Sequence, residues 1–506
     1  MNISFKPSNT SLSRQGDLPY FLETCESCIG PLASLKMIVS SNGTVVTTSS
    51  STRLWQLLDL DQVVVQLILE ATANLPDYRL QSSALAARLM MEEGDDVDIE
   101  ELSECIERSA VRLDVSKMRE LLSLVRTVIR PKAKASGLLT TEIETLSVKI
   151  VEAWLRTLPD QPDTGLGEMV VKVLETGGSE DILTVQGLLY PHQPTYDDFI
   201  EDMRGPIRVV VYDTMLDTHQ TEDWEDKRLE YDLEAEASWG PVDVLSRVSS
   251  LGVRLVACQK VVSWPTRRAL EEAGIQVMER LGTAGRARLV LLSGARPVSS
   301  MNHQVREEDI GTLDTLNNVT VGSRNYLHLN TGTSNLVSLL LGSLGEQQAE
   351  ELEAVIKRSV ESLNDLVTQP QPSVLPGGGC LESCLSLQTT NRRLRRTLIK
   401  SALIPGKLNI SEAFVDPEYG HLFATESSTR CQCGIVEARD LCEAKFIPAL
   451  QIYTDLSLPS RTLSTRELPA SGHTSLLDSF TFKKSALLTA VETAQHLSNI
   501  GMLISY

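Results

Sequence analysis

The segment with the clearest chemical potential is a run of three glycines after a proline. Pro376-Gly377-Gly378-Gly379 leads directly into a helical pattern that starts at Cys380. Glycine lets a ligand approach bare backbone, and the N–H groups at the start of a helix attract anions such as phosphate. By itself the run is a weak signal, because most such runs are plain turns or flexible loops.

Cysteines offer a second kind of chemistry, the binding of metals by thiolates. The chain has nine, and close pairs occur at Cys25 and Cys28, at Cys380 and Cys384, and at Cys431 and Cys433. A zinc site needs two such pairs with histidine or cysteine partners at a regular spacing. The three pairs lie far apart in the sequence, and no histidine is near the first two. We therefore expect buried free thiols rather than a zinc site.

The composition of the chain narrows the classes of protein to which it can belong. A chain of 506 residues with 42% apolar and 23% charged residues predicts a globular protein of two or three compact units. Its net charge of −20 argues against nucleic-acid binding, and we expect the one basic run, Arg392 to Arg396, to lie on a solvated helix face. The sequence has no run of about twenty apolar residues, so we expect no membrane span. The N-terminus lacks the apolar core of a signal peptide, so we expect a cytosolic protein.

Helical spacing dominates both ends of the chain. Apolar residues recur at helical intervals over residues 51–130, and again over 143–155, 347–365, 380–403 and 475–500. These stretches predict outer parts made of packed helices.

The middle of the chain has a different pattern. Short apolar segments around glycine at residues 170–188 predict strands of a hinge. Beyond them, residues 209–212, 254–258, 275–278 and 287–292 predict strands, with a helix over 264–272. A small mixed sheet covered by helices follows from this alternation. The acidic residues 218–237 between the strands predict a protruding helix or mobile loop.

Several segments, in the same order, resemble group II chaperonin subunits. Residues 29–38 resemble L-G-P-K-G-M-D-K-M-L, 43–51 resemble G-D-V-T-I-T-N-D-G, and 76–80 fall where that family has G-D-G-T-T. Residues 362–365 resemble S-L-H-D, 374–382 resemble V-x-P/G-G-G-G-x-x-E, and 477–494 resemble the last helix of the family. The resemblance covers nearly the whole chain.

The resemblance implies a multidomain fold of the α+β and α/β classes. Its parts would be a helical equatorial domain (1–125 and 375–506), a small hinge-like intermediate domain (126–187 and 341–374) and an α/β apical domain (188–340).

The resemblance also implies a nucleotide site, with ATP and Mg²⁺ as the candidate cofactors. In the family, glycine loops cradle phosphates while carboxylates hold Mg²⁺ and activate water. The matching residues are Gly30, Pro31, Asp77, Gly377, Gly378 and Gly379 for the nucleotide, Asp77 for Mg²⁺ and Asp365 for catalysis. A register slip of three residues would place Ser362 at the catalytic position. Solvated or capping carboxylates remain the commoner role for both aspartates.

Much of this loop chemistry is changed in the chain. Ser50 replaces an aspartate and Ala33 a glycine, while Leu32 replaces a lysine. Around Asp77 both glycines and both hydroxyls of the family are gone, and Tyr78 would fill space that phosphate oxygens need. Loss of a general base alone costs about 10²–10⁴ in rate. We therefore expect weak or absent ATPase activity.

Such erosion resembles the chaperonin-like proteins of the McKusick–Kaufman and Bardet–Biedl group. This implies a chaperone and assembly factor that acts with other chaperonin-like proteins and the cytosolic chaperonin on the Bardet–Biedl complex, which serves cilia. It also implies residence in the cytoplasm and at the centrosome or ciliary basal body. The acidic segment Glu222–Glu236 is the candidate contact for protein clients, with a solvated loop as its alternative.

Two other functions stay open. One is an ATP-dependent folding subunit that acts in a ring, which requires Asp77 and Asp365 to compensate for the changed loops. The other is a small-molecule enzyme that uses the α/β region. It is disfavoured because that region has no Ser-His-Asp set, paired catalytic carboxylates or dinucleotide glycine motif.

Overall fold

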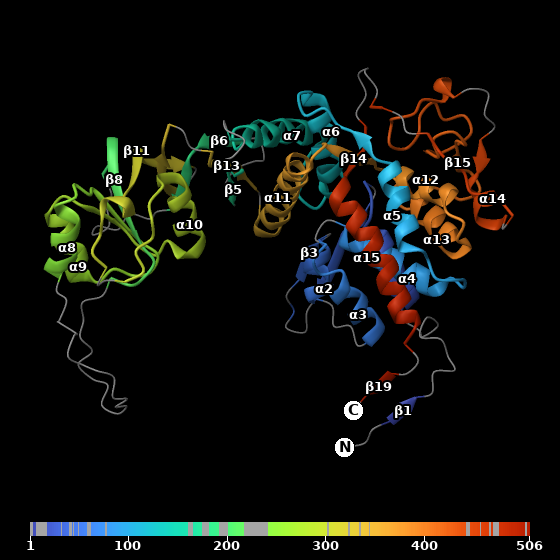
Figure 1. Ribbon diagram of the computed structural model, residues 1–506, viewed down its shortest axis with the longest axis horizontal. Coiled ribbons are helices and arrows are strands. Elements are labelled where there is room, and N and C mark those ends of the chain that lie inside the picture. The colour runs from blue at the N-terminus through green and yellow to red at the C-terminus, as the bar shows by residue number, and fades with distance from the viewer. Residues whose placement is uncertain are drawn as a thin grey trace. The chain divides into compact units, whose positions relative to one another are not determined.

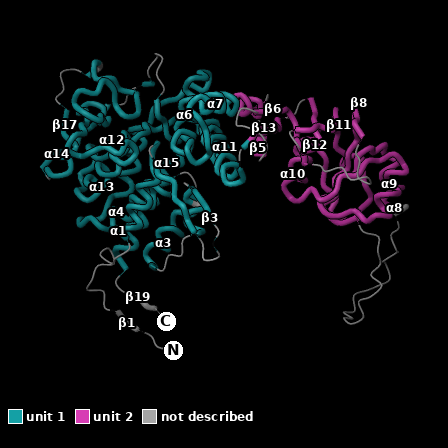
Figure 2. Tube along the Cα trace, turned by 180° about the vertical axis from the view of Figure 1, so that it is seen from behind, with its two compact units in different colours: residues 1–151, 343–506 teal, residues 152–342 magenta. Residues whose placement is uncertain are grey.

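The computed structural model describes most of the chain. The described residues are 4–6, 18–31, 33–39, 43, 45–48, 50–57, 62–75, 78–159, 165–174, 182–191, 201–216, 241–300, 303–321, 324–332, 335–343, 345–441, 446–455, 457–464, 467–468, 475–500 and 503–505. The chain divides into two compact units, residues 1–151 with 343–506 and residues 152–342 (Figure 2). Among the described helices, none is long and apolar enough to cross a membrane.

Unit 1, the part built from both ends of the chain, is mainly helical (Figure 1). Its helices are α1 (Leu18–Ser27), α2 (Ser51–Leu57), α3 (Val63–Ala71), α4 (Arg79–Met91), α5 (Ile99–Arg108), α6 (Met118–Ile129), α11 (Glu346–Thr368), α12 (Cys380–Gln388), α13 (Arg392–Leu403), α14 (Ala449–Thr454) and α15 (Phe480–Ser498). Helix α7 (Thr140–Leu155) crosses the sequence boundary between the units. The predicted helical ends of the chain are confirmed.

The core of unit 1 forms where α4 from the N-terminal segment lies against α15 from the C-terminal segment (Figure 1). Helix α4 is buried on most sides, and its middle is small: Ser82, Ser83, Ala84, Ala86 and Ala87 are all buried. A helix without a polar face belongs in a core rather than at a surface. Small side chains here let α15 approach closely, and Ser82 donates a hydrogen bond to the Ala486 carbonyl oxygen at 2.9 Å.

Small sheets tie distant segments of unit 1 together. They pair β1 (Ser4–Lys6) with β19 (Leu503–Ser505), β2 (Lys36–Val39) with β3 (Val45–Thr48), β14 (Ser373–Pro376) with both β4 (Val111–Arg112) and β18 (Leu477–Ser479), and β15 (Phe414–Val415) with both β16 (Leu422–Phe423) and β17 (Ile447–Pro448). All these pairings are antiparallel. The sheet of β4, β14 and β18 sets the starting points of both α12 and α15.

Unit 2 contains a six-stranded mixed sheet in the order β10-β9-β8-β11-β12-β7. Its strands are β7 (Leu188–Pro191), β8 (Met203–Tyr212), β9 (Leu255–Cys258), β10 (Gln276–Met278), β11 (Gly311–Val321) and β12 (Arg324–Asn330). A second sheet joins β5 (Met169–Leu174), β13 (Val337–Gly342) and β6 (Leu183–Gln186). The prediction of a small mixed sheet, preceded by short strands near residues 170–188, is confirmed.

Alternate residues of β8 face two different cores, as a strand's period of two requires. Val209 and Val211 pack with α10 (Gly282–Ser293) on one face of the sheet. Val210 and Tyr212 pack on the other face with α8 (Pro241–Ser249) and α9 (Trp264–Glu272). The sheet is therefore covered by helices on both faces.

The prediction of a strand over residues 287–292 is wrong, because these residues lie in α10. The buried positions Gly285, Leu289 and Leu292 follow helical spacing, while Leu291 is 56% exposed. Periodicity cannot separate a short apolar run in a strand from one in a helix. Gly294, in the left-handed conformation with φ 71°, ends the helix.

The basic run on α13 also differs from expectation. Arg393 and Arg395 are buried rather than solvated. Arg393 donates to the Leu89 carbonyl oxygen at 2.8 Å, and Arg395 donates to the Thr389 carbonyl oxygen at 2.8 Å. Burial lowers the pKa of both guanidinium groups. These carbonyl partners allow the charges to enter the core, since a buried polar group must be hydrogen-bonded.

The triple glycine forms the tight turn between β14 and α12. Gly378 and Gly379 have positive φ angles of 62° and 87°. A Cβ on Gly379 would overlap the Ala402 carbonyl oxygen at the end of α13, and one on Gly378 would lie 3.3 Å from the Gln432 backbone. Glycine is thus required here by contacts within the protein, whether or not a ligand is bound.

We expect Gly379→Ala to lower the free energy of unfolding by about 1–3 kcal/mol. The added Cβ would overlap the Ala402 carbonyl oxygen, and alanine disfavours the positive φ at this position. Urea denaturation followed by circular dichroism measures the change. Gly43→Ala is the matched control in the same unit: Gly43 has φ 82° but nothing within 4 Å of an added Cβ. Equal losses for the two variants would show that the contact with Ala402 is unimportant.

Candidate nucleotide pocket

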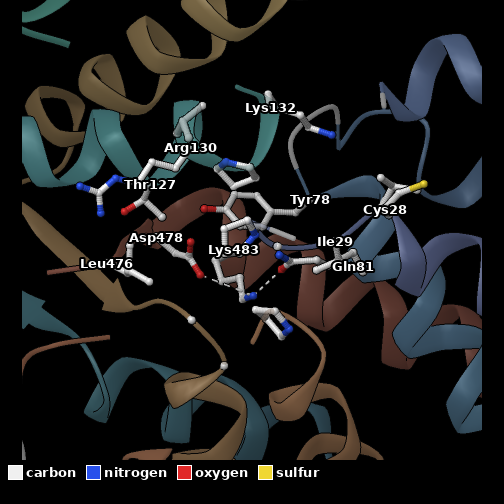
Figure 3. A pocket seen from close by; sticks show the side chains of 18 of the residues that line it. Cys28, Ile29, Tyr78, Gln81, Thr127, Arg130, Lys132, Leu476, Asp478 and Lys483 are labelled. Carbon is white, nitrogen blue, oxygen red and sulfur yellow. Dashed lines mark hydrogen bonds and ion pairs between the residues drawn. The ribbon is translucent and has the colours of Figure 1, made fainter. Parts of the chain in front are cut away.

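A cavity of about 260 Å³ lies within unit 1 (Figure 3). Its described lining residues come from five segments, with Arg358 and Pro405 in addition: Cys28, Ile29, Gly30 and Pro31; Tyr78, Leu80 and Gln81; Thr127, Val128, Arg130, Pro131 and Lys132; Gly378 and Gly379; Leu476, Asp478 and Lys483. The first two of these segments come from the N-terminal part of the chain and the last from its end. The core contact between α4 and α15 therefore brings the cavity walls together.

Four of the predicted nucleotide residues line the cavity. Gly30, Pro31, Gly378 and Gly379 all line this cavity. Gly377 is beside it, and its N–H donates to the Leu476 carbonyl oxygen at 2.9 Å. Asp77, the predicted Mg²⁺ ligand, lies outside the described residues.

The buried ammonium group of Lys483 is the strongest electrostatic feature of the cavity. The side chain is only 2% exposed, and its Nζ lies 2.6 Å from Glu382 Oε1 and 3.6 Å from Asp478 Oδ2. It also donates a hydrogen bond to Gln81 Oε1 (Figure 3). Burial favours the neutral amine, but the two carboxylates outweigh it and raise the pKa of Lys483.

Asp478 is the only carboxylate among the described lining residues. Burial raises its pKa, and the neighbouring Lys483 charge opposes that shift. A hydrogen bond with the Tyr78 side chain acts in the same direction as Lys483. The oxygens of Asp478 are therefore already used by partners inside the protein.

Tyr78 is part of the cavity wall (Figure 3). Its side chain is buried, and its ring centroid is 5.4 Å from Lys483 Nζ, within range of a cation–π contact. Its hydroxyl oxygen accepts a hydrogen bond from the Ser479 N–H at 3.2 Å. The Tyr78 side chain is thus held by the lysine and by the start of α15.

Asp365, the predicted catalytic carboxylate, does not line the cavity. Its Oδ2 accepts hydrogen bonds from Ser479 Oγ at 2.6 Å and from Gln369 Nε2 at 3.0 Å. Ser479 in turn caps α15 by accepting from the Phe482 N–H at 3.3 Å. Asp365 therefore supports the helix start, and its role in activating water stays a prediction. Ser362, the alternative in the sequence register, is buried in the same helix, α11.

The described lining residues offer few ligands for Mg²⁺. Mg²⁺ needs free oxygen ligands in near-octahedral geometry. Within the described part of the cavity, the one carboxylate is bound to Lys483 and Tyr78. What remains is a wall with three basic side chains, Arg130, Lys132 and Arg358, around a buried aromatic ring.

Comparison with known proteins identifies the family. The profile of the TCP-1/cpn60 chaperonin family matches residues 93–397, more than half of the chain. The chain belongs to this family. The predicted resemblance to chaperonins is confirmed, and so is the fold class of a multidomain protein with mixed helices and sheets.

Relatives of two kinds match. The chain is 24% identical to the mouse protein "Molecular chaperone MKKS", over 94% of this chain and 93% of that protein. The Pongo abelii protein of the same name is 23% identical, over 96% and 95%. Thermosome subunit alpha of Sulfurisphaera tokodaii is 22% identical over 72% of this chain and 70% of the archaeal one. A chaperonin-like role is thus supported, and near-full-length matches are to chaperonin-like proteins.

Sequence reasoning missed the lysine at the centre of this site. Lys483 has apolar neighbours at helical spacing, Ala486, Leu487 and Ala490, all of them buried. A charge on the apolar face of a helix signals a buried ion pair, and this signal was available. Its partner Glu382 could not be found in the same way, because Glu382 lies on α12, far from Lys483 in the sequence.

Two of the cysteine pairs that are far apart in the sequence come together in the structure. Cys380 meets Cys431 and Cys433 beside His421. Separation in sequence does not limit contact once α12 packs on the segment that follows it. The eight cysteines that the structure describes are all buried, and none of them is in a disulfide.

We expect Lys483→Met to lower the free energy of unfolding by about 3–5 kcal/mol, because Glu382 and Asp478 would stay buried without a counter-charge. Urea denaturation is the measurement. The adjacent Lys484→Met is the control, since Lys484 pairs with the more exposed Glu107 and should cost no more than about 1 kcal/mol. Similar costs for both variants would contradict the buried-pair interpretation. Adding Glu382→Gln to Lys483→Met should recover part of the loss.

Proposed function

We propose that this protein is a chaperonin-like factor that assists the folding or assembly of protein complexes, with weak or no ATP hydrolysis. The observation that carries the proposal is the position of Tyr78 in the cavity, held by Lys483 and by the start of α15. A side chain in this place competes with a phosphate group, while the chaperonin fold around it is kept. Family membership and the two MKKS relatives support the chaperone part.

The finer role that we propose is assembly of the Bardet–Biedl complex, which serves cilia, together with the cytosolic chaperonin and other chaperonin-like proteins. We propose the cytoplasm, with the centrosome or ciliary basal body, as the place of action. The similarity to MKKS proteins over almost the whole chain supports this choice over a purely archaeal-type role. We also propose the five-segment division into equatorial, intermediate and apical domains, with residues 188–340 as the apical domain.

Client binding through the proposed apical domain is supported by an apolar surface in unit 2. Met215, Val261 and Trp264 are all exposed, and Trp264 is 63% exposed. They belong to two adjoining segments, because the Leu216 N–H donates to the Val261 carbonyl oxygen and the Ser263 N–H to that of Leu216. Clustered apolar exposure of this kind marks interaction sites. The acidic segment Glu222–Glu236, the client contact expected from sequence, lies outside the described residues.

The alternative is an ATP-dependent folding subunit that acts in a ring. The convergence of Gly30, Gly378 and Gly379 on one cavity with basic side chains favours it. It requires Asp77 to supply the Mg²⁺ ligand and Asp365 to activate water. Nucleotide binding and turnover decide between the two functions.

For the wild-type protein we expect ATP turnover roughly 10²-fold or more below that of an active chaperonin ring, in a sensitive phosphate-release assay. Tyr78→Ala should bind a fluorescent ATP analogue with Mg²⁺ at least about tenfold more tightly, because removing the ring enlarges the cavity. Tyr20→Ala, which truncates a tyrosine that is 71% exposed on α1, should leave affinity unchanged. Ring-like turnover by the wild type would establish the ATP-driven alternative.

For partner binding we expect the full-length protein to co-purify from cells in a large complex with cytosolic chaperonin subunits. Trp264→Asp should reduce this recovery several-fold, because it places a charge on the apolar surface. Leu291→Asp is the control: Leu291 is similarly exposed but lies on α10, which covers the other face of the sheet. A wild-type protein recovered only as a monomer without partners would refute the assembly role.

A further inference from the structure

Four buried side chains that commonly bind metals meet beside the glycine turn. They are Cys380 at the start of α12, His421 just before β16, and Cys431 and Cys433 in the turn that follows. Their ligand atoms all lie within 4.8 Å of one another. None of the four side chains is more than 5% exposed.

The distances within this cluster are close to those of a tetrahedral centre. Cys431 Sγ lies 3.4 Å from Cys433 Sγ, and His421 Nδ1 lies 3.1 Å from Cys433 Sγ. Tetrahedral Zn²⁺ with Zn–S near 2.3 Å and Zn–N near 2.0 Å holds its ligand atoms about 3.5–3.8 Å apart. The four atoms therefore enclose a position from which a metal could reach all of them after small side-chain movements.

The backbone around two of the cysteines is folded as a metal-binding turn. Gly434 N–H donates to the Cys431 carbonyl oxygen at 3.0 Å, and Gly434 has φ 76°. The Val436 N–H points at Cys431 Sγ, at 3.2 Å. An N–H donor to sulfur stabilises a thiolate, which is the form that binds metal.

The histidine is also held in place before any metal binds. Asp416 is fully buried, and its Oδ2 accepts a hydrogen bond from the backbone N–H of His421 at 2.7 Å. The Asp416 N–H donates in turn to the His421 carbonyl oxygen at 3.1 Å. This turn presents Nδ1 to the sulfur atoms.

We propose that Cys380, His421, Cys431 and Cys433 bind one structural Zn²⁺ ion. Three thiolates and one imidazole form a donor set typical of structural zinc, and four protein ligands leave no open position for catalysis. The soft sulfur donors disfavour Mg²⁺ and Ca²⁺, which take oxygen ligands.

The zinc centre would brace one wall of the cavity. The Cys433 carbonyl oxygen accepts from the Leu476 N–H at 2.8 Å, and the Leu476 carbonyl oxygen accepts from the Gly377 N–H at 2.9 Å. Gln432, between the two cysteines, lies against Gly378. Metal binding thus cross-links α12, the β16 segment and the 431–433 turn, and its free energy adds to that of folding.

Zinc content of the full-length protein, prepared without metal-affinity resin, tests the proposal directly. We expect about one zinc per chain by mass spectrometry of the metal. Replacing zinc with Co²⁺ should give the intense visible bands of tetrahedral cobalt and a thiolate-to-cobalt charge-transfer band. Removal by a strong chelator should lower the melting temperature, and added Zn²⁺ should restore it.

Variants locate the metal. Cys433→Ser and His421→Ala should each lose most of the zinc and the cobalt spectrum. Cys384→Ser is the matched control, because Cys384 is buried one turn further along α12 and its Sγ contacts the Tyr419 carbonyl oxygen instead. The wild-type spectra need no variant, so the test holds even if a substituted protein fails to fold.

Three outcomes would overturn the proposal. One is full-length protein without zinc and without a cobalt spectrum. Another is a disulfide between Cys431 and Cys433 in the purified protein, seen by mass spectrometry after blocking free thiols. The third is zinc that persists in Cys433→Ser, which would place the metal elsewhere.

Discussion

The burial of the Lys483 charge is the constraint on which the rest of unit 1 depends. Removing an ammonium group from water carries a large free-energy cost, and only close opposite charges and hydrogen bonds offset it. Those partners come from three separate elements: Glu382 from α12, Asp478 from β18 and Gln81 from α4. The lysine itself is on α15. Any rearrangement that separates these elements exposes or unpairs a charge, so their mutual positions are closely determined.

Contacts within the protein also hold several of the predicted nucleotide residues in place. The triple glycine is held by contacts with Ala402 and Gln432, which exist without a nucleotide. Asp365 supports the capping serine of α15. Residues that a folding machine would use for ATP therefore also have structural roles in this chain. Their presence is not by itself a sign of hydrolysis.

The sequence predicted the helices and strands of the fold better than the residues of the candidate nucleotide pocket. Helices near both termini, the α/β middle and strands at 209–212 and 275–278 were all recovered, because they follow local periodicity. The run at 287–292 was misassigned because a few apolar residues carry no clear period. Four of the predicted nucleotide residues, Gly30, Pro31, Gly378 and Gly379, line one cavity. Their placement came from resemblance rather than from any property of the glycines themselves.

The sequence alone determined the order of helical and α/β segments and the family resemblance, because both depend on patterns among neighbouring residues. Tertiary structure alone decided which distant side chains meet. It paired Lys483 with Glu382, set the Tyr78 ring over that lysine, and brought Cys380 to His421 and the 431–433 turn. The physical reason is that such contacts arise only when the two ends of the chain pack into one core, and no local pattern encodes that packing.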